Sequence, residues 1–203
     1  MLLGLITDIH EHTAHLQAAL DEFTVQGVDQ VVVIGDLFEM GKSIHETCCL
    51  LSDAGAIGVW GNHDIGLCRP NEEVRTKYSP ETLRFMATLK PRLVTKNCYF
   101  SHIEPWLNPE ELSDLWYLNG PPDSNKDLKR IFNSCDHRYM FSGHYHLWLL
   151  STPDRIHDWS GYDPVSLKRD RSFVVVGALC EGRFATFDTE TCVLTPFNID
   201  AVC

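Results

Sequence analysis

The sequence has little positive charge and no long apolar run. It carries 17 Lys and Arg against 28 Asp and Glu, a formal net charge of −11, and no block of basic residues interrupts this acidity. Such a field repels the nucleic-acid backbone, so we expect no non-specific binding to nucleic acid. No apolar run approaches the roughly 20 residues of a membrane-spanning helix, so we expect no membrane partner.

An export signal and paired-cysteine motifs are also lacking. The apolar start, Met1 to Ile6, is too short for a signal-peptide core and has no basic residues before it. Eight cysteines occur, but none with Cys-x-x-Cys spacing, so we interpret them as free, mostly buried thiols. These features favour an intracellular, cytoplasmic protein.

The composition is that of a globular chain with a substantial core. Hydrophobic residues make up 44% and charged residues 22% of the 203 positions. No repeat, low-complexity tract or linker divides the chain, so we predict a single domain over residues 1–203. The sequence does not define an oligomeric state and leaves a homo-oligomer open.

Strand-like and helix-like segments alternate over the first two-thirds of the chain. Helix starts are indicated by a capping box at Ser43, by Ser79-Pro80 and by Asn108-Pro109. The alternation predicts a largely parallel sheet covered by helices. The five apolar runs that read as strands are Leu2 to Ile6, Val31 to Ile34, Ala56 to Trp60, Cys98 to Phe100 and Tyr139 to Phe141.

After residue 146 the pattern changes, because four further runs follow one another without helices between them. This predicts an antiparallel meander or a second sheet. The runs are Leu147 to Ser151, Ser172 to Val176, Arg183 to Asp188 and Cys192 to Phe197.

Each of the five early runs ends in side chains that can bind a metal or move a proton. Ligand sites in open α/β sheets form beyond the carboxyl ends of the strands, so we expect these side chains to converge. They are Asp8, His10, Asp36, Asn62, His63, His102, His144 and His146.

The individual motifs differ in how much they indicate. Asp8-x-His10 and Gly35-Asp36 are weak, because such pairs are common in loops and at helix caps. Gly61-Asn62-His63-Asp64 is sharper, since a tight turn exposes several polar groups directly after a strand. Gly143-His144-Tyr145-His146 is also sharp, since two histidines in this spacing after a strand and a glycine favour ligation.

Taken together and in this order, the motifs resemble those of the calcineurin-like metallophosphoesterase superfamily. Gly41, six residues after Gly35, also matches the family's second motif. The resemblance covers Asp8 to His146, and the later strands fit the family's second sheet. It implies an α/β fold, a four-layer αββα sandwich of two mixed β-sheets flanked by helices.

The resemblance also implies a site with two divalent metal ions. Asp8, His10 and His146 would hold one ion, Asn62, His102 and His144 the other, and Asp36 would bridge both. Mixed nitrogen and oxygen donors suit manganese, iron, zinc, cobalt or nickel better than magnesium or calcium, and we expect manganese to support activity in assays.

The implied reaction is hydrolysis of a phosphodiester or phosphomonoester by a metal-bridging hydroxide. His63 would act as general acid on the leaving alkoxide, and Asp64 would orient His63. The partner would be a small phosphate ester, with nucleotides among the candidates.

Three departures from the family pattern narrow this interpretation. Glu39-Met40-Gly41 replaces Asp-Arg-Gly, so the arginine that clamps phosphate in phosphoprotein phosphatases is missing. His102 is followed by Ile103 rather than the usual glycine, which puts the leaving-group pocket in doubt. The run 176–179, Val-Gly-Ala-Leu, replaces the Asn-Pro-Gly-Ser turn of small phosphodiesterases.

Other interpretations stay open beside the enzyme. A scaffold that has lost catalysis is the alternative, although such proteins usually lose ligands that this chain retains. The 152–171 loop, with Trp159 and Tyr162, could close over a substrate, but packing or a dimer contact is the simpler expectation. For three further tryptophans we expect core packing rather than base stacking: Trp106, Trp116 and Trp148. The remaining histidines are expected to be surface or structural: His12, His15, His45, His137 and His157.

Overall fold

Two six-stranded mixed sheets form the centre of the protein. The computed structural model describes residues 1–117 and 119–199. The first sheet has the order β3 (Ile57–Val59), β2 (Gln30–Ile34), β1 (Leu2–Ile6), β11 (Arg183–Asp188), β12 (Val193–Asn198), β9 (Val165–Ser166). The second has the order β4 (Leu93–Thr95), β5 (Cys98–Phe100), β6 (Tyr139–Ser142), β10 (Ser172–Val175), β7 (Leu149–Thr152), β8 (Arg155–Ile156).

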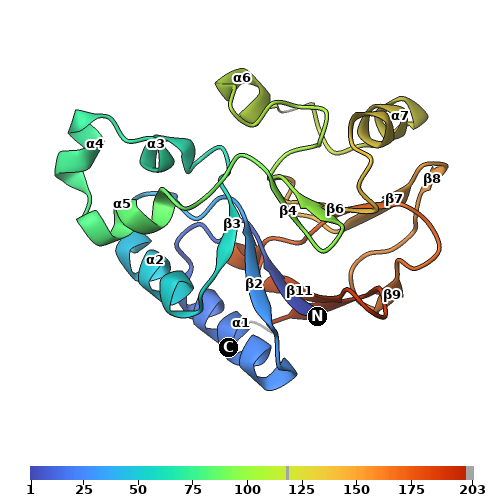
Figure 1. Ribbon diagram of the computed structural model, residues 1–203, viewed down its shortest axis with the longest axis horizontal. Helices are drawn as coiled ribbons and strands as arrows, with labels where there is room; N and C mark the ends of the chain where they lie inside the picture. The colour runs from blue at the N-terminus through green and yellow to red at the C-terminus, as the bar shows by residue number, and fades with distance from the viewer. Residues whose placement is uncertain (118, 200–203) are drawn as a thin grey trace.

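Helices cover the outer faces of both sheets (Figure 1). The first sheet packs against helices from the first half of the chain, and the second against α7. The helices are α1 (Thr13–Gln26), α2 (Ile44–Asp53), α3 (Ile65–Cys68), α4 (Glu72–Lys77), α5 (Pro80–Met86), α6 (Leu112–Leu115) and α7 (Asn125–Ser134), with a 3₁₀ turn at Leu179–Glu181. The four-layer αββα sandwich is therefore confirmed.

Alternation along the strands divides the core into three layers. In β2, Val32 and Ile34 face the second sheet, whereas Val31 and Val33 face the helices. In β6, Phe141 joins the inner core and Met140 packs with α7. Side chains on a strand point alternately to opposite faces, so a continuous apolar run supplies two cores at once.

The distribution of strands over the two sheets differs from the prediction. The parallel strands do not share one sheet: β1, β2 and β3 pair in the first, and β5, β6 and β10 in the second. The later strands do not form a sheet of their own, because β7 and β10 join the second and β11 and β12 the first. All of β10 is buried, and a strand with two apolar faces is stable only at a central position.

Two of the three predicted helix starts are confirmed. The Ser79 hydroxyl accepts a hydrogen bond from the Thr82 amide and Pro80 is the first residue of α5. Ser43 precedes α2, although its side chain makes no capping bond. The start at Asn108-Pro109 is wrong, because α6 begins at Leu112 and the Pro109 carbonyl accepts a hydrogen bond from the Trp60 indole at 2.9 Å.

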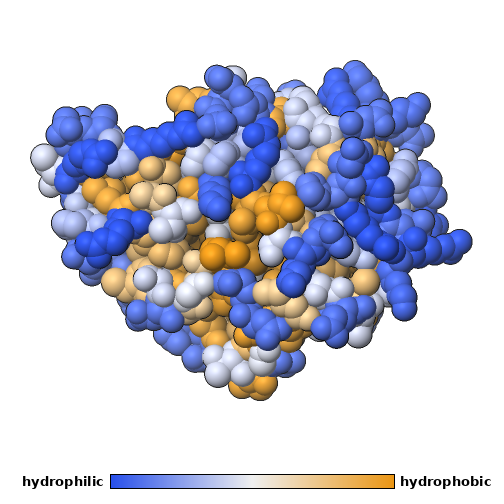
Figure 2. Space-filling model, viewed as in Figure 1, coloured by the Kyte–Doolittle hydropathy of each residue, from blue (hydrophilic) through white to orange (hydrophobic). Residues whose placement is uncertain are grey.

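The edges of the two sheets keep some apolar surface. Figure 2 shows hydrophobic side chains in the middle of one face, over the region where Figure 1 labels β3 and β4. Both are edge strands, and their residues Ile57 and Val94 are 36% and 52% exposed. In the described part of the chain, no helix is both long and apolar enough to span a bilayer.

The aromatic layer between the sheets offers a test of the fold. Phe187 is fully buried and its ring centroid lies 5.0 Å from Tyr139 and 5.2 Å from Phe141. We expect Phe187→Ala to lower the free energy of unfolding by about 3–5 kcal/mol, because it leaves a cavity between the sheets. Urea denaturation followed by circular dichroism measures this. Val94→Ala, on an exposed edge, should change it by less than about 0.5 kcal/mol; equal effects would contradict the assignment.

Candidate functional site

The polar residues that follow five strands meet at one end of the sandwich. The strands β1, β2 and β3 are parallel, as are β5 and β6, so each set delivers its following loops to one end. These loops enclose a cavity of about 470 Å³. Its lining consists of His10, His12, Asp36, Glu39, Asn62, His63, Trp116, His144, His146 and Cys180.

A first cluster of donor atoms contains Asp8, His10 and His146. One ligand atom from each lies within 4.8 Å of the others. The Nε2 atom of His146 is 3.3 Å from Asp8 Oδ1 and 3.2 Å from Nε2 of His10. Two imidazole nitrogens and a carboxylate oxygen therefore point at one small volume.

A second cluster contains Asn62, His102 and His144. The Asn62 Oδ1 atom lies 3.1 Å from His102 Nε2 and 3.0 Å from His144 Nδ1. Asp36 connects the two clusters, because its Oδ2 atom is 3.3 Å from His102 Nε2 and 3.8 Å from His10 Nε2. The structure thus brings together all seven residues that the resemblance assigns to metal binding.

Backbone carbonyls fix the orientation of two of these imidazoles. His102 Nδ1 lies 2.7 Å from the Ile34 carbonyl, and His144 Nε2 lies 3.0 Å from the Tyr117 carbonyl. Because a carbonyl only accepts, these nitrogens carry the protons, and in the neutral rings the opposite nitrogens present lone pairs to Asn62 and Asp36. Such partners commonly orient histidine ligands.

The carboxylates and imidazoles shift one another's proton affinity. Burial alone would lower the pKa of His102, but the charge of Asp36 outweighs it and raises that pKa to about 9. A hydrogen bond to Asp8 raises the pKa of His146 to about 10. Burial opposes the ionisation of Asp36, yet His102 lowers its pKa well below the usual range. The cluster is therefore built around two carboxylates that attract cationic partners.

Several of these residues sit on strained backbone. Positive φ angles occur at Asp8 (50°), His10 (44°), Asp36 (56°), His144 (75°) and His146 (50°). Non-glycine residues rarely adopt this conformation, and it costs about 1–3 kcal/mol where the surroundings enforce it. The strand ends turn sharply at these positions, which aims the side chains back into the cavity.

Two motif glycines are needed because their backbones lie against the ligands. A Cβ at Gly61 would lie 2.0 Å from Asp36 Oδ1, and one at Gly143 would lie 1.9 Å from Thr7 Oγ1. No side chain fits such gaps. The glycines of these motifs therefore serve close approach between loops.

His63 stands at the open side of the clusters. Its backbone amide donates to Asp36 Oδ1 at 3.0 Å, which fixes the start of the side chain. Its ring is half-buried, with its centroid 4.9 Å from that of His10 and 5.2 Å from that of Trp116. The imidazole is thus placed where it can meet a group bound in the cavity.

Asp64, which the resemblance expects to orient His63, directs its carboxylate to backbone amides. Its carboxylate is fully buried and accepts hydrogen bonds from the amides of Leu37, Phe38 and Gly61 at 2.9–3.0 Å. Burial, followed by the charge of Asp36, raises its pKa to about 6. Asp64 therefore joins the loops after β2 and β3.

Sequence reasoning missed two residues beside the site. The Glu11 carboxylate accepts hydrogen bonds from the amides of Glu39, Gly41 and Ser43, which ties the loop after β2 to that after β1. No motif marks this acid. Trp116 was expected in the core, but it is 46% exposed and lines the cavity, because Leu115 takes the buried position at the end of α6.

The other aromatic residues largely follow expectation. Trp106 packs on Tyr117 and Trp148 on Trp159, with ring centroids 5.2 and 5.5 Å apart. No residue of the 152–171 loop lines the cavity, although Tyr162 is 81% exposed. Among the histidines set aside, His12 lies at the cavity rim.

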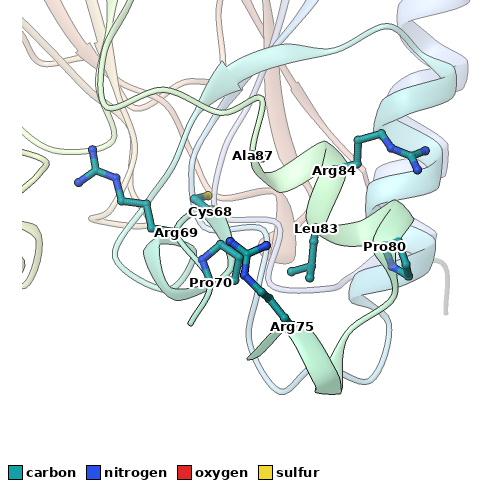
Figure 3. Close-up of a pocket in the computed structure, with 8 residues that line it drawn as sticks. All are labelled: Cys68, Arg69, Pro70, Arg75, Pro80, Leu83, Arg84 and Ala87. Carbon is teal, nitrogen blue, oxygen red and sulfur yellow. The ribbon is translucent and has the colours of Figure 1, made fainter. Parts of the chain in front are cut away.

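A larger cavity, of about 750 Å³, lies among α3, α4 and α5 (Figure 3). Arg69, Arg75 and Arg84 line it, but none of the strand-end residues does. In Figure 3 the guanidinium groups of Arg69 and Arg84 point to opposite sides. These two groups therefore do not converge, and the strand-end residues line the smaller cavity instead.

Comparison with known proteins finds one similar sequence and solved structures of the same fold. The chain is 29% identical over 172 residues to an uncharacterized protein of Methanocaldococcus jannaschii, which covers 75% of the chain and 65% of that protein. A metallophosphoesterase from Sphaerobacter thermophilus superposes with a TM-score of 0.80 at 20% identity, over 98% of this chain and 89% of the other. An archaeal phosphodiesterase superposes with a TM-score of 0.57 at 15% identity, over 98% of this chain and 100% of that one.

The match to a family is more direct. Residues 1–195 match the model of the calcineurin-like phosphoesterase superfamily domain, and this range includes every residue of both clusters. The fold, the two clusters and this match lead to one conclusion: the chain belongs to the calcineurin-like phosphoesterase superfamily.

Proposed function

We propose that the protein is a phosphoesterase that hydrolyses a small phosphomonoester or phosphodiester with the help of two divalent metal ions. The observation that carries this proposal is the pair of donor clusters that share Asp36. Asp8, His10 and His146 would hold one ion, and Asn62, His102 and His144 the other.

The donor atoms fit such ions. With Asp36 shared, each cluster offers four protein ligands of mixed nitrogen and oxygen type. This mixture suits manganese, iron, zinc, cobalt or nickel, and magnesium and calcium prefer oxygen alone. The carbonyl partners of His102 and His144 further support ligation, because they leave the opposite ring nitrogens, which face the cluster, available to a metal ion once the rings are neutral.

Charge explains why metal ions would be needed for substrate capture. None of the described residues that line the cavity is a lysine or arginine, and the chain carries a net charge of −11. Two divalent ions against the carboxylates of Asp8 and Asp36 would leave the site positive. Bound there, the ions supply Lewis acidity and lower the pKa of water.

The chain's own contribution to the chemical step is centred on His63. A water oxygen forms a bond to phosphorus while the bond from phosphorus to the leaving oxygen breaks. His63 donates a proton to that oxygen, and the proton released by the attacking water restores the imidazole. The anchored amide of His63 and its half-buried ring support this role.

The residues around the site narrow the class of substrate. Met40, where phosphoprotein phosphatases carry a phosphate-clamping arginine, is 70% exposed, so no side chain of that kind reaches the cavity from this loop. The similarity to an archaeal phosphodiesterase supports phosphodiesters, as well as phosphomonoesters, as candidate substrates. A scaffold without catalysis is less well supported, because both clusters and His63 are intact.

The first prediction concerns metal dependence. Protein stripped with a chelator should hydrolyse neither p-nitrophenyl phosphate nor bis(p-nitrophenyl) phosphate, and added manganese should restore turnover. Preference for the diester would place the protein among phosphodiesterases, and preference for the monoester among phosphatases. Absence of turnover with manganese, iron, zinc, cobalt and nickel alike would favour the scaffold.

The second prediction separates His63 from metal binding. His63→Ala should lower kcat by about 10²- to 10⁴-fold, the usual contribution of a general acid, while calorimetry shows manganese binding close to that of the wild type. His137→Ala is the matched control, because His137 precedes β6 at the end opposite His144. Unchanged turnover of His63→Ala would remove this residue from the mechanism.

The third prediction tests the close approach of the loops. Gly61→Ala should weaken manganese binding by about 10- to 100-fold, as for other disturbances next to metal ligands, because the new Cβ displaces Asp36. Gly66→Ala is the control, since no atom lies within 4 Å of its added Cβ. Calorimetric titration measures both. Equal affinities would show that Asp36 is not held at the metal site as proposed.

A further inference from the structure

An indole ring lies at the rim of the cavity beside the proposed general acid. Trp116 is 46% exposed, and its ring centroid is 5.2 Å from that of His63 with an angle of 47° between the planes. His63 in turn contacts His10 at 4.9 Å. Trp116 is thus one ring away from His63 and two from the first donor cluster, on the side of the proposed general acid.

The neighbours of Trp116 hold it in this position. Leu115 is fully buried and fixes the end of α6. The ring of Tyr117 packs edge-on against Trp106 at 5.2 Å, and its carbonyl accepts a hydrogen bond from His144 Nε2 at 3.0 Å. The residues before and after Trp116 in the sequence are therefore both anchored, and Tyr117 is anchored to His144 of the second cluster.

The remaining lining of the cavity offers smaller and more polar surfaces than an indole ring. It consists of imidazole, carboxylate, amide and thiol side chains, and Trp116 is the exception among the residues that line it. An isolated exposed tryptophan is unremarkable on a protein surface. One that is anchored at the mouth of a polar site, next to the acid that serves the leaving group, has a surface suited to stacking.

We propose that Trp116 stacks on a planar base in the leaving alcohol, which makes esters of nucleosides the favoured substrate class. This inference rests on the proposed function, because His63 defines the side of the leaving alcohol. The phosphate would lie at the two clusters and the base against the indole. The base–indole contact discriminates a nucleoside from a sugar that lacks the base.

AMP and ribose 5-phosphate provide a clean comparison, because both present the same primary alcohol and differ by the base. If manganese-loaded protein hydrolyses AMP and ribose 5-phosphate, KM is measured for both compounds. If it does not hydrolyse them, both are tested as inhibitors of bis(p-nitrophenyl) phosphate hydrolysis and their inhibition constants are compared. We expect AMP to be favoured by about 5- to 100-fold in the wild type, the range of base–aromatic stacking. Trp116→Ala should reduce this ratio to near one, and Trp116→Tyr should retain most of it.

Two further measurements keep the result decisive. Tyr162→Ala, which removes an even more exposed aromatic ring from the 152–171 loop, should leave the ratio unchanged. Calorimetric titration with AMP and ribose 5-phosphate gives the same comparison without turnover. If neither p-nitrophenyl ester is hydrolysed, the proposed function fails while these titrations still decide the role of Trp116. A wild-type ratio near one, or a ratio that survives Trp116→Ala, would overturn the inference.

Discussion

The buried carboxylate of Asp36 is the constraint around which the site is arranged. A charge removed from water is stable only with close partners, and Asp36 has His102 at 3.3 Å and the His63 amide at 3.0 Å. Its backbone carbonyl also accepts hydrogen bonds from the amides of Ile9 and His10. One residue therefore sets the relative positions of the loops after β1, β2, β3 and β5.

The two-sheet architecture allows the loops that carry the donor residues to meet. A single parallel sheet would present its loops along one line, whereas two stacked sheets present them on opposite sides of a shared gap. Asn62 from the first sheet and His102 and His144 from the second meet across that gap, 3.0–3.1 Å apart. The apolar layer below, which includes Phe141 and Phe187, fixes the separation of the sheets and hence the spacing of the donors.

Features of the fold and the site that depend on residues close together in the sequence could be predicted, whereas features that depend on residues far apart could not. Asp8, Asp36, Asn62, His102 and His144 could be found because each directly follows an apolar strand, which is a local signal. The position of β10 between β6 and β7 could not, because strand order depends on pairing between distant segments. Asp64 was assigned to its sequence neighbour, yet its bonds run to amides that include Leu37, 27 positions away. Trp116 was misplaced because composition does not show which of two adjacent apolar residues enters the core.

The central position of β1 has a consequence for the order in which the protein can assemble. This strand pairs with β2 on one side and with β11 on the other, where Leu2 lies opposite Asp188. During synthesis, β1 and β2 emerge before β11, and the second edge of β1 stays unpaired until the chain has been made as far as Arg183. Contacts of such long range are slow to form, and an open apolar edge invites association with other chains. The first sheet is therefore completed late in synthesis, when β11 inserts between β1 and β12.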